Sequence, residues 1–264
     1  VELLGPGSLR HNKDVILEQM TWPEVQDLGR EIVVLIPTGS IEQHGPHLPL
    51  GTDTRLAAAA AQAAEARLPD HVLLTPTLWL GMSGHHLAFS GTLSASEIAY
   101  SSALESVIRS LSRHGFYKFY VLNGHGGNAD ANSLTLRRIK EQSPELMLGH
   151  SGYFAFGAAR AREVMEGPLK EIRHACEAEA SLMMHLALDS VRSEKLRDDG
   201  LYSEPAVQGM VHFFDEMTQE GSFGYATLAT AEKGRAIFEA CVDGAAEEIR
   251  RLAEGYLLVS RPRE

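Results

Sequence analysis

The sequence predicts an α/β fold of three layers (α/β/α), with helices on both faces of a mostly parallel central sheet. Short β-branched and aromatic runs alternate with stretches of helical periodicity, in the order β-α-β-α-β-α-β-α. The first run, residues 31–37, is almost entirely apolar rather than alternating, which is typical of a strand buried on both faces. Buried strands joined by helices form parallel sheets that are covered on both sides.

The first half of the chain contains two predicted helices and a second strand. Residues 54–67 are rich in alanine and other good helix formers, and Pro69 ends that helix. Residues 72–75 form a short apolar run, which predicts a strand. The segment Ser94-Ala95-Ser96-Glu97 has the form of a capping box, and apolar residues then recur at helical spacing up to Gly115.

The second half repeats this alternation. Strands are expected at residues 116–122 and 146–153, and helices from the glycine-rich loop 123–128 to about residue 142, over 174–188, and over 231–253. Gly255 ends the last helix. Residues 192–224 have mixed periodicity, and we interpret them as a segment outside the α/β alternation that covers a pocket.

Composition limits the class of protein. The chain has 264 residues and a net charge of −11, which disfavours sequence-independent binding to nucleic acid or to anionic membranes. Its apolar runs fall far short of the ~20 residues that span a bilayer. Two cysteines cannot build a disulfide framework or a four-cysteine zinc site, which favours a reducing compartment. We therefore expect a cytoplasmic protein with a small-molecule partner.

The domain organisation is predicted to be simple. No internal repeat, low-complexity run or linker is visible, so we expect a single domain over residues 1–264. Residues 1–10 are left out of the fold prediction, because their pattern is that of an added or disordered segment.

The loop after the first strand contains Glu42, His44 and Asp53. It lies at the carboxyl end of a strand, where open α/β sheets bind ligands. Glu42 and His44 are two residues apart, which places both side chains on one side of an extended chain. Two carboxylates and an imidazole suit Zn²⁺, Mn²⁺ or Fe²⁺. The alternative is that Asp53 caps the next helix and His44 bonds the backbone.

The glycine-rich loop Asn123-Gly124-His125-Gly126-Gly127-Asn128 joins a strand to a helix. Such loops often bind anions, so a phosphate- or nucleotide-binding module without catalysis stays open as an alternative. However, the loop has neither the lysine of a P-loop nor the spacing of a dinucleotide fingerprint. His125 favours a metal, and the backbone N–H groups would then be free to hold an oxyanion.

The third group of candidate residues is His174, Glu177 and Glu179. A helix turns by about 100° per residue, so His174 and Glu179 meet only if His174 precedes the helix, which we expect. Glu177 is interpreted as a surface charge. Glu179 has small or apolar neighbours, and a buried carboxylate needs a cation.

These segments resemble the creatininase family of metal-dependent amidohydrolases over most of the chain. The matching motifs are Glu-x-His-Gly-x-His-Leu-Pro with a following Asp, Asn-Gly-His-Gly-Gly-Asn, and His-Ala-x-x-x-Glu-x-Ser. Residues 81–92 resemble a fourth family motif, with His85 in place of a Glu and Ser90 in place of a Pro.

The resemblance implies an enzyme with two adjacent divalent ions, zinc first and manganese or iron as alternatives. One ion would be held by Glu42, Asp53 and His125, and the other by His44, Asp53 and Glu179, with Asp53 as the bridge. His174 and Glu179 would be catalytic, with His174 as the proton donor to the leaving nitrogen. The substrate-binding residues would be Ser83, His86, Gly126 and Gly127.

The family also implies a homo-oligomer, a hexamer, and hydrolysis of a C–N amide bond in a small molecule. Creatininase has a Glu ligand where this chain has Gly127, a Tyr at Gly126 and a Trp near Lys170. We therefore expect a substrate other than creatinine and no aromatic clamp for a flat ring. A formamide, a peptide bond, or a changed reaction at a C–C or ring C–O bond are the alternatives.

Overall fold

A four-stranded parallel sheet forms the centre of the computed structural model, which describes residues 15–201 and 210–255. Its strands lie in the order β2-β1-β3-β4, and Val33 of β1 pairs with Val72 of β2 and Lys118 of β3. The bounds are β1 (Val33–Thr38), β2 (Val72–Leu74), β3 (Lys118–Asn123) and β4 (Met147–Gly152). The predicted α/β fold with a parallel sheet is confirmed.

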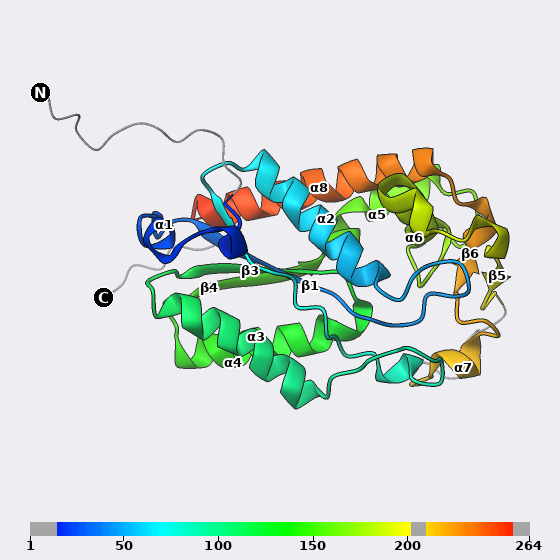
Figure 1. The fold of residues 1–264 in the computed structure, drawn as a ribbon, viewed down its shortest axis with the longest axis horizontal. Helices are drawn as coiled ribbons and strands as arrows, with labels where there is room; N and C mark the ends of the chain where they lie inside the picture. The colour runs from blue at the N-terminus through cyan, green and yellow to red at the C-terminus, as the bar shows by residue number, and fades with distance from the viewer. Residues whose placement is uncertain (1–14, 202–209, 256–264) are drawn as a thin grey trace, which may run out of the picture.

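Helices cover both faces of this sheet (Figure 1). One layer holds α2 (Thr52–Arg67), α5 (Tyr153–Val164), α6 (Glu177–Ala187) and α8 (Ala231–Ala253), and the other holds α3 (Glu97–Ser112) and α4 (Ala129–Gln142). Shorter elements are α1 (Trp22–Gln26), α7 (Phe214–Met217), β5 (Asp198–Asp199) and β6 (Gly224–Tyr225), and the last two form a small antiparallel sheet. None of the helices in the described residues is long and apolar enough to cross a membrane.

The apolar run of β1 is explained by a core on each side of the sheet. Val33 and Leu35 belong to the cluster that includes residues of α2 and α8, whereas Val34 and Ile36 belong to the cluster that includes residues of α3 and α4. All six residues of β1 are buried. A strand covered on both faces has no solvent side, so it needs no alternation.

Most predicted elements are found within a few residues of their expected bounds, but the start of α3 is different. Its N-cap is Ser96, whose hydroxyl accepts a hydrogen bond from the Ala99 amide at 3.2 Å. Ser94 instead accepts from the backbone N–H of Ser83 at 2.9 Å. The predicted capping box was therefore wrong, because the Ser94 hydroxyl bonds the Ser83 amide instead of the start of the helix.

Helix α5 was missed by the sequence analysis. It follows β4 without a loop, and it packs closely along α8. Gly157 makes this approach possible, because a Cβ there would lie 2.3 Å from the Cys241 sulfur. The contact depends on α8, which comes some eighty residues later, so the local pattern alone does not reveal it.

The segments with the candidate residues meet at the carboxyl edge of the sheet. Thr38 and Asn123, the last residues of β1 and β3, are paired in register, and the Thr38 hydroxyl donates to Asn123 Oδ1 at 3.0 Å. The loops that follow these strands leave the sheet toward α6 and α7, on the right of Figure 1. Helix α6 begins at Glu177, so His174 precedes the helix as expected.

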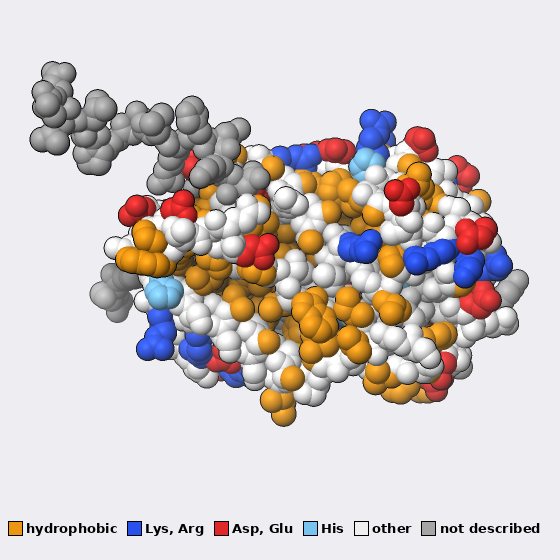
Figure 2. Space-filling view, in the orientation of Figure 1, with side chains coloured by type: hydrophobic (Ala, Val, Ile, Leu, Met, Phe, Trp, Pro, Cys, Tyr) orange, Lys and Arg blue, Asp and Glu red, His pale blue; other side chains and the backbone are white. Residues whose placement is uncertain are grey.

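Hydrophobic side chains also gather on an outer face, over the segment between β2 and α3 (Figure 2). Four large side chains of that segment are exposed: Trp79, Leu80, Leu87 and Leu93. This surface lies in the same stretch of chain as Ser83 and His86.

Candidate metal centre

The structure brings the five predicted metal ligands together. Glu42 and His44 lie in the loop after β1, Asp53 in the first turn of α2, His125 after β3, and Glu179 in the first turn of α6. All five side chains are buried, and the most exposed, Glu179, has 7% of its surface accessible.

Asp53 occupies the centre of the group. Its Oδ1 lies 3.0 Å from Nε2 of His44, and its Oδ2 lies 3.0 Å from Nδ1 of His125. One carboxylate thus faces two imidazoles with different oxygens. This is the arrangement that a bridging ligand requires.

Glu42 and Glu179 extend the group on opposite sides of Asp53. Glu42 Oε2 lies 3.2 Å from His125 Nδ1, while Glu179 Oε2 lies 3.9 Å from His44 Nε2. Glu179 also accepts a hydrogen bond from the Ala175 amide. Glu42 thus lies against His125 and Glu179 lies nearer to His44, while the division into two ligand sets stays a prediction.

The alternative roles of Asp53 as a helix cap and of His44 as a backbone-bonding residue find limited support. The N-cap of α2 is Gly51, and no side chain caps this helix. His44 does bond the backbone, with Nδ1 3.1 Å from the Glu42 carbonyl oxygen, but this leaves Nε2 directed at Asp53. Metal-binding histidines commonly donate their second N–H to a carbonyl in this way.

The donor set fits a metal ion. Glu42 Oε2 and Asp53 Oδ2 are buried oxygens without a hydrogen bond. Within the described residues, the ion pairs of the three carboxylates are all with histidines. Buried carboxylates need a compensating positive charge, and oxygen with imidazole nitrogen suits zinc, manganese or iron.

The ionisation of these groups reflects their crowding. Burial lowers the pKa of His44, but Asp53, Glu179 and Glu42 outweigh it and raise the value to about 10. The pKa of His125 is likewise raised against burial, by Glu42 and Asp53. Burial raises the pKa of Glu179 to about 7 despite the nearby His44. The two imidazoles lower the pKa of Asp53, although burial opposes them.

His174 lies at the edge of the same cluster. Its Nε2 is 2.7 Å from the Gln43 carbonyl oxygen, so this nitrogen donates, and its Nδ1 is 3.5 Å from Glu42 Oε1. Burial, together with His44 and His86, holds its pKa well below the usual value. Three close triads of possible ligand atoms are Glu42–His86–His174, His44–His174–Glu179 and Glu42–His44–Asp53. His174 is thus placed to serve as a ligand or as a proton donor, and its predicted role as donor stays a prediction.

The four predicted substrate-binding residues surround His125 and Glu42. The Ser83 hydroxyl bonds Ser40 and lies 3.5 Å from His125 Nε2, while His86 Nε2 lies 3.2 Å from Glu42 Oε1. A Cβ on Gly126 would meet nothing within 4 Å, whereas one on Gly127 would lie 2.4 Å from His125 Nε2. A larger residue at position 127 would displace His125, which is consistent with the carboxylate ligand being supplied by Glu179.

Two residues at the site were missed. The Gln43 side chain bonds His86, and its backbone carbonyl oxygen accepts a hydrogen bond from His174. Phe214 of α7 stacks on His86, with ring centroids 4.0 Å apart, and meets His174 edge-on at 4.7 Å. From the sequence we expected no aromatic clamp for a flat ring, but we did interpret residues 192–224, which include Phe214, as covering a pocket. Residues 202–209 of that segment lie outside the described part of the chain.

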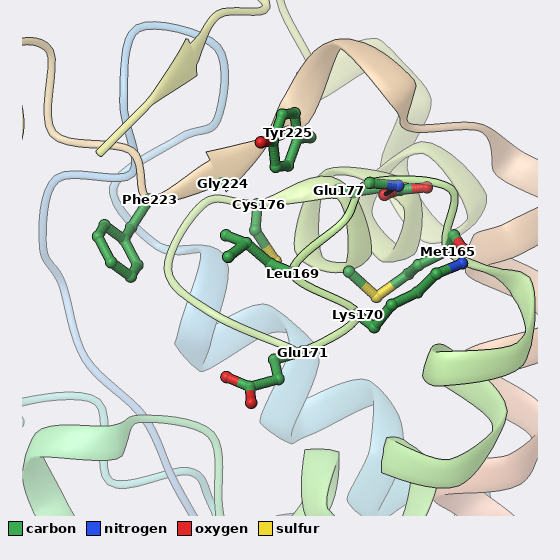
Figure 3. A pocket seen from close by; sticks show the side chains of 10 residues that line it. Met165, Leu169, Lys170, Glu171, Cys176, Glu177, Phe223, Gly224 and Tyr225 are labelled. Carbon is green, nitrogen blue, oxygen red and sulfur yellow. Dashed lines mark hydrogen bonds between the residues drawn. The ribbon is translucent and has the colours of Figure 1, made fainter. Parts of the chain in front are cut away.

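The interpretation of Glu177 as a surface charge was wrong. Its side chain is fully buried, and its carboxylate accepts from the backbone N–H groups of Glu166 and Gly167 at 2.8 and 2.9 Å and from Lys233 Nζ at 2.7 Å. Figure 3 shows this carboxylate beside the hollow lined by Leu169, Lys170 and Cys176. Glu177 therefore anchors the loop before α6 and belongs to a different place from the metal ligands.

Comparison with known families gives a consistent result. A family model described as creatininase, creatinine amidohydrolase, matches residues 18–249. The mycofactocin precursor peptide peptidase of Mycobacterium ulcerans (strain Agy99) is 31% identical over 246 residues, which cover 89% of this chain and 88% of the relative. The creatinine amidohydrolase of Pseudomonas putida is 28% identical over 255 residues, or 90% of this chain and 97% of the relative.

Solved structures are similar throughout. A crystal structure of creatinine amidohydrolase has a TM-score of 0.79 and 28% identity, and the match covers 91% of this chain and 98% of that one. A mutant creatininase of the zinc–zinc type has a TM-score of 0.78 and 28% identity over 91% of this chain and 98% of that one. A manganese creatininase has a TM-score of 0.79 and 28% identity over 90% and 98%.

Proposed function

Because this chain belongs to the creatininase family, we propose that it is a metal-dependent amidohydrolase that cleaves a C–N amide bond of a small molecule. The observation that carries the proposal is Asp53, whose two oxygens each lie 3.0 Å from a different imidazole. We propose two divalent ions, zinc first and manganese or iron as alternatives. Glu42, Asp53 and His125 would hold one, and His44, Asp53 and Glu179 the other.

Ions at such a site lower the pKa of water toward neutrality and polarise a carbonyl oxygen. The protein's own contribution is to bury the carboxylates of Glu42, Asp53 and Glu179 and to place histidines around them. The Asn128 N–H donates to the His125 carbonyl at 3.1 Å, so the N–H groups of Gly126 and Gly127 are the ones proposed to bind the oxygen of an attacked amide.

His174 is proposed as the group that protonates the leaving nitrogen. Its Nε2 hydrogen is engaged by the Gln43 carbonyl, so Nδ1, on the Glu42 side of the ring, is the nitrogen that would take up the proton of the attacking water and pass it to the leaving nitrogen. The adjacent ring of Phe214 keeps water from one side of His174 and His86. A proton donor fixed in this way contributes about 10²–10⁴-fold to such a reaction.

The substrate is proposed to be an amide other than creatinine. Gly126 leaves open space beside the glycine-rich loop. The similarity to a precursor peptide peptidase makes a peptide bond the first alternative substrate, and a formamide the second. Both share the same chemical step, the attack of water on a C–N amide carbonyl.

The test combines metal analysis with a substrate screen. We expect about two divalent ions per chain and hydrolysis of at least one compound among formamides, lactams and short peptides. Asp53→Ala should lose both ions together with the activity. Asp243→Ala is the matched control, since Asp243 is an exposed partner of Arg67 at 3.4 Å. Full metal content in Asp53→Ala would refute the shared ligand, and anion binding without any hydrolysis would favour the phosphate-binding alternative.

We also propose a homo-oligomer, a hexamer as in other family members. The exposed side chains of Trp79, Leu80, Leu87 and Leu93 support a contact surface between subunits (Figure 2). Light scattering of the purified protein tests this, and a monomer near the chain mass of 28.8 kDa would contradict it.

A further inference from the structure

Gln43 connects four segments of the site. Its backbone N–H donates to the Thr92 hydroxyl at 3.1 Å, and its carbonyl oxygen accepts from His174 Nε2 at 2.7 Å. Its side-chain Nε2 lies 2.8 Å from His86 Nδ1 and 2.8 Å from the Gly221 carbonyl oxygen. The side chain is buried, with 5% of its surface accessible.

The orientation of the Gln43 amide is determined by its partners. Oε1 lies 2.9 Å from the Gly45 backbone nitrogen, which can only donate. Nε2 therefore carries the two amide hydrogens, and one of them is accepted by the Gly221 carbonyl. The other is directed at His86 Nδ1, which must then be an unprotonated acceptor.

This hydrogen bond assigns the proton on His86. With Nδ1 unprotonated, the hydrogen of the imidazole is on Nε2, which lies 3.2 Å from Glu42 Oε1. His86 then donates to Glu42 and holds one carboxylate oxygen. The other oxygen, Oε2, remains directed toward His125 Nδ1 at 3.2 Å, where the proposed ligands converge.

The same residue orients His174. Both amide hydrogens of Gln43 are already used, and the Gln43 carbonyl oxygen requires a donor, so the hydrogen of His174 is on Nε2. Nδ1 of His174 is thereby left facing Glu42. One glutamine thus sets the ring nitrogens of two histidines that both face Oε1 of Glu42.

We propose that Gln43 is a positioning residue, which fixes the Nε2–H form of His86 and of His174 and so holds Glu42 in the orientation that binding of a metal requires. This inference rests on the proposed function for its effects on zinc binding and on turnover. The protonated nitrogens of the two histidines can be measured without any substrate.

The experiment uses the full chain labelled with nitrogen-15 histidine, with zinc bound and after removal of zinc. Protonated and unprotonated ring nitrogens give well-separated NMR signals, which a His86→Phe variant assigns. In the wild type we expect His86 with Nε2 protonated and Nδ1 free of both proton and metal. Gln43→Glu replaces the donor by an acceptor and should move the proton of His86 to Nδ1, whereas Gln43→Leu should leave Nδ1 without a hydrogen bond and mix the two forms.

Turnover provides the second measurement. We expect both Gln43 variants to lose about 10–100-fold in zinc affinity or in kcat at saturating zinc, the usual effect of removing a residue that orients a ligand. Gln62→Leu is the control, because Gln62 is an exposed glutamine of α2.

The outcomes are distinguishable. A protonated Nδ1 on His86 in the wild type overturns the proposal, and this result does not depend on the folding of either Gln43 variant. Unchanged His86 signals in both variants also overturn it, because Gln43 would then be an ordinary packing residue. The expected spectra in a protein that hydrolyses no amide would support the role of Gln43 while refuting the proposed function.

Discussion

The ion pair between Lys233 and Glu177 provides a test of how the site is supported. Lys233 Nζ donates to Glu177 Oε1 at 2.7 Å and to the Leu228 carbonyl oxygen at 2.6 Å. The lysine side chain is 10% exposed and that of Glu177 is fully buried. Lys233→Met keeps the length of the side chain and removes its charge, so it leaves the Glu177 carboxylate without a cation.

The expected cost follows from what remains around Glu177. Loss of one partner from a buried ion pair destabilises a protein by about 3–5 kcal/mol when the other charge is left uncompensated. Here the N–H groups of Glu166 and Gly167 still donate at 2.8 and 2.9 Å, so we expect the lower end, about 3 kcal/mol. For a chain of this size, that corresponds to a decrease in Tm of about 6–12 °C.

The assay is denaturant unfolding of three variants alongside the wild type. Lys233→Met should lose about 3 kcal/mol, and Lys233→Met combined with Glu177→Gln should recover part of this loss, because the neutral amide needs no cation. Lys195→Met is the control, since Lys195 is exposed. A free energy of unfolding for Lys233→Met equal to that of Lys195→Met would refute the reasoning, as would a double variant less stable than the single one.

Further predictions concern the site and its pH dependence. His174→Asn should keep both metal ions and slow turnover by about 10²–10⁴-fold, with a larger decrease for an alkyl amide than for an activated anilide. Loss of metal, or an equal decrease for both substrates, would show that His174 is a ligand or a structural residue. Gly127→Ala should lose metal, because its Cβ would lie 2.4 Å from His125 Nε2, whereas Gly126→Ala should keep it; equal metal content in the two variants contradicts this. The pKa of Lys233 is raised above 10.5 by Glu177 and Glu166, although burial opposes them. The stability that the lysine contributes is therefore complete below pH 10.5 and is lost as the pH rises through the higher folded value. The free energy of unfolding should decrease less above pH 10.5 in Lys233→Met than in the wild type, and parallel curves would argue against it.

Several features of this protein were determined by short stretches of its sequence. The helix over Ala231–Ala253 has the predicted bounds, because its apolar spacing and the glycine after it are both local signals. The strand Val33–Thr38 was predicted from a continuous apolar run, which reflects burial on both faces. The five proposed ligands were taken from the family resemblance. The structure places them close together because the carboxyl ends of its parallel strands lie at one edge of the sheet.

Other features were decided only by tertiary contacts that the local sequence pattern does not show. The N-cap of α3 moved to Ser96 because Ser94 bonds Ser83, and α5 is held by its packing against α8. Phe214 reaches the histidines from a segment whose pattern indicated no regular element. Gln43 gains its role from His86, His174 and Gly221, which lie far away along the chain. Local sequence determines which backbone structure forms and which groups it presents. The hydrogen-bond partner of a buried group is decided by the packing of the whole chain, because a group that loses its water must bond whichever donor or acceptor the fold places beside it.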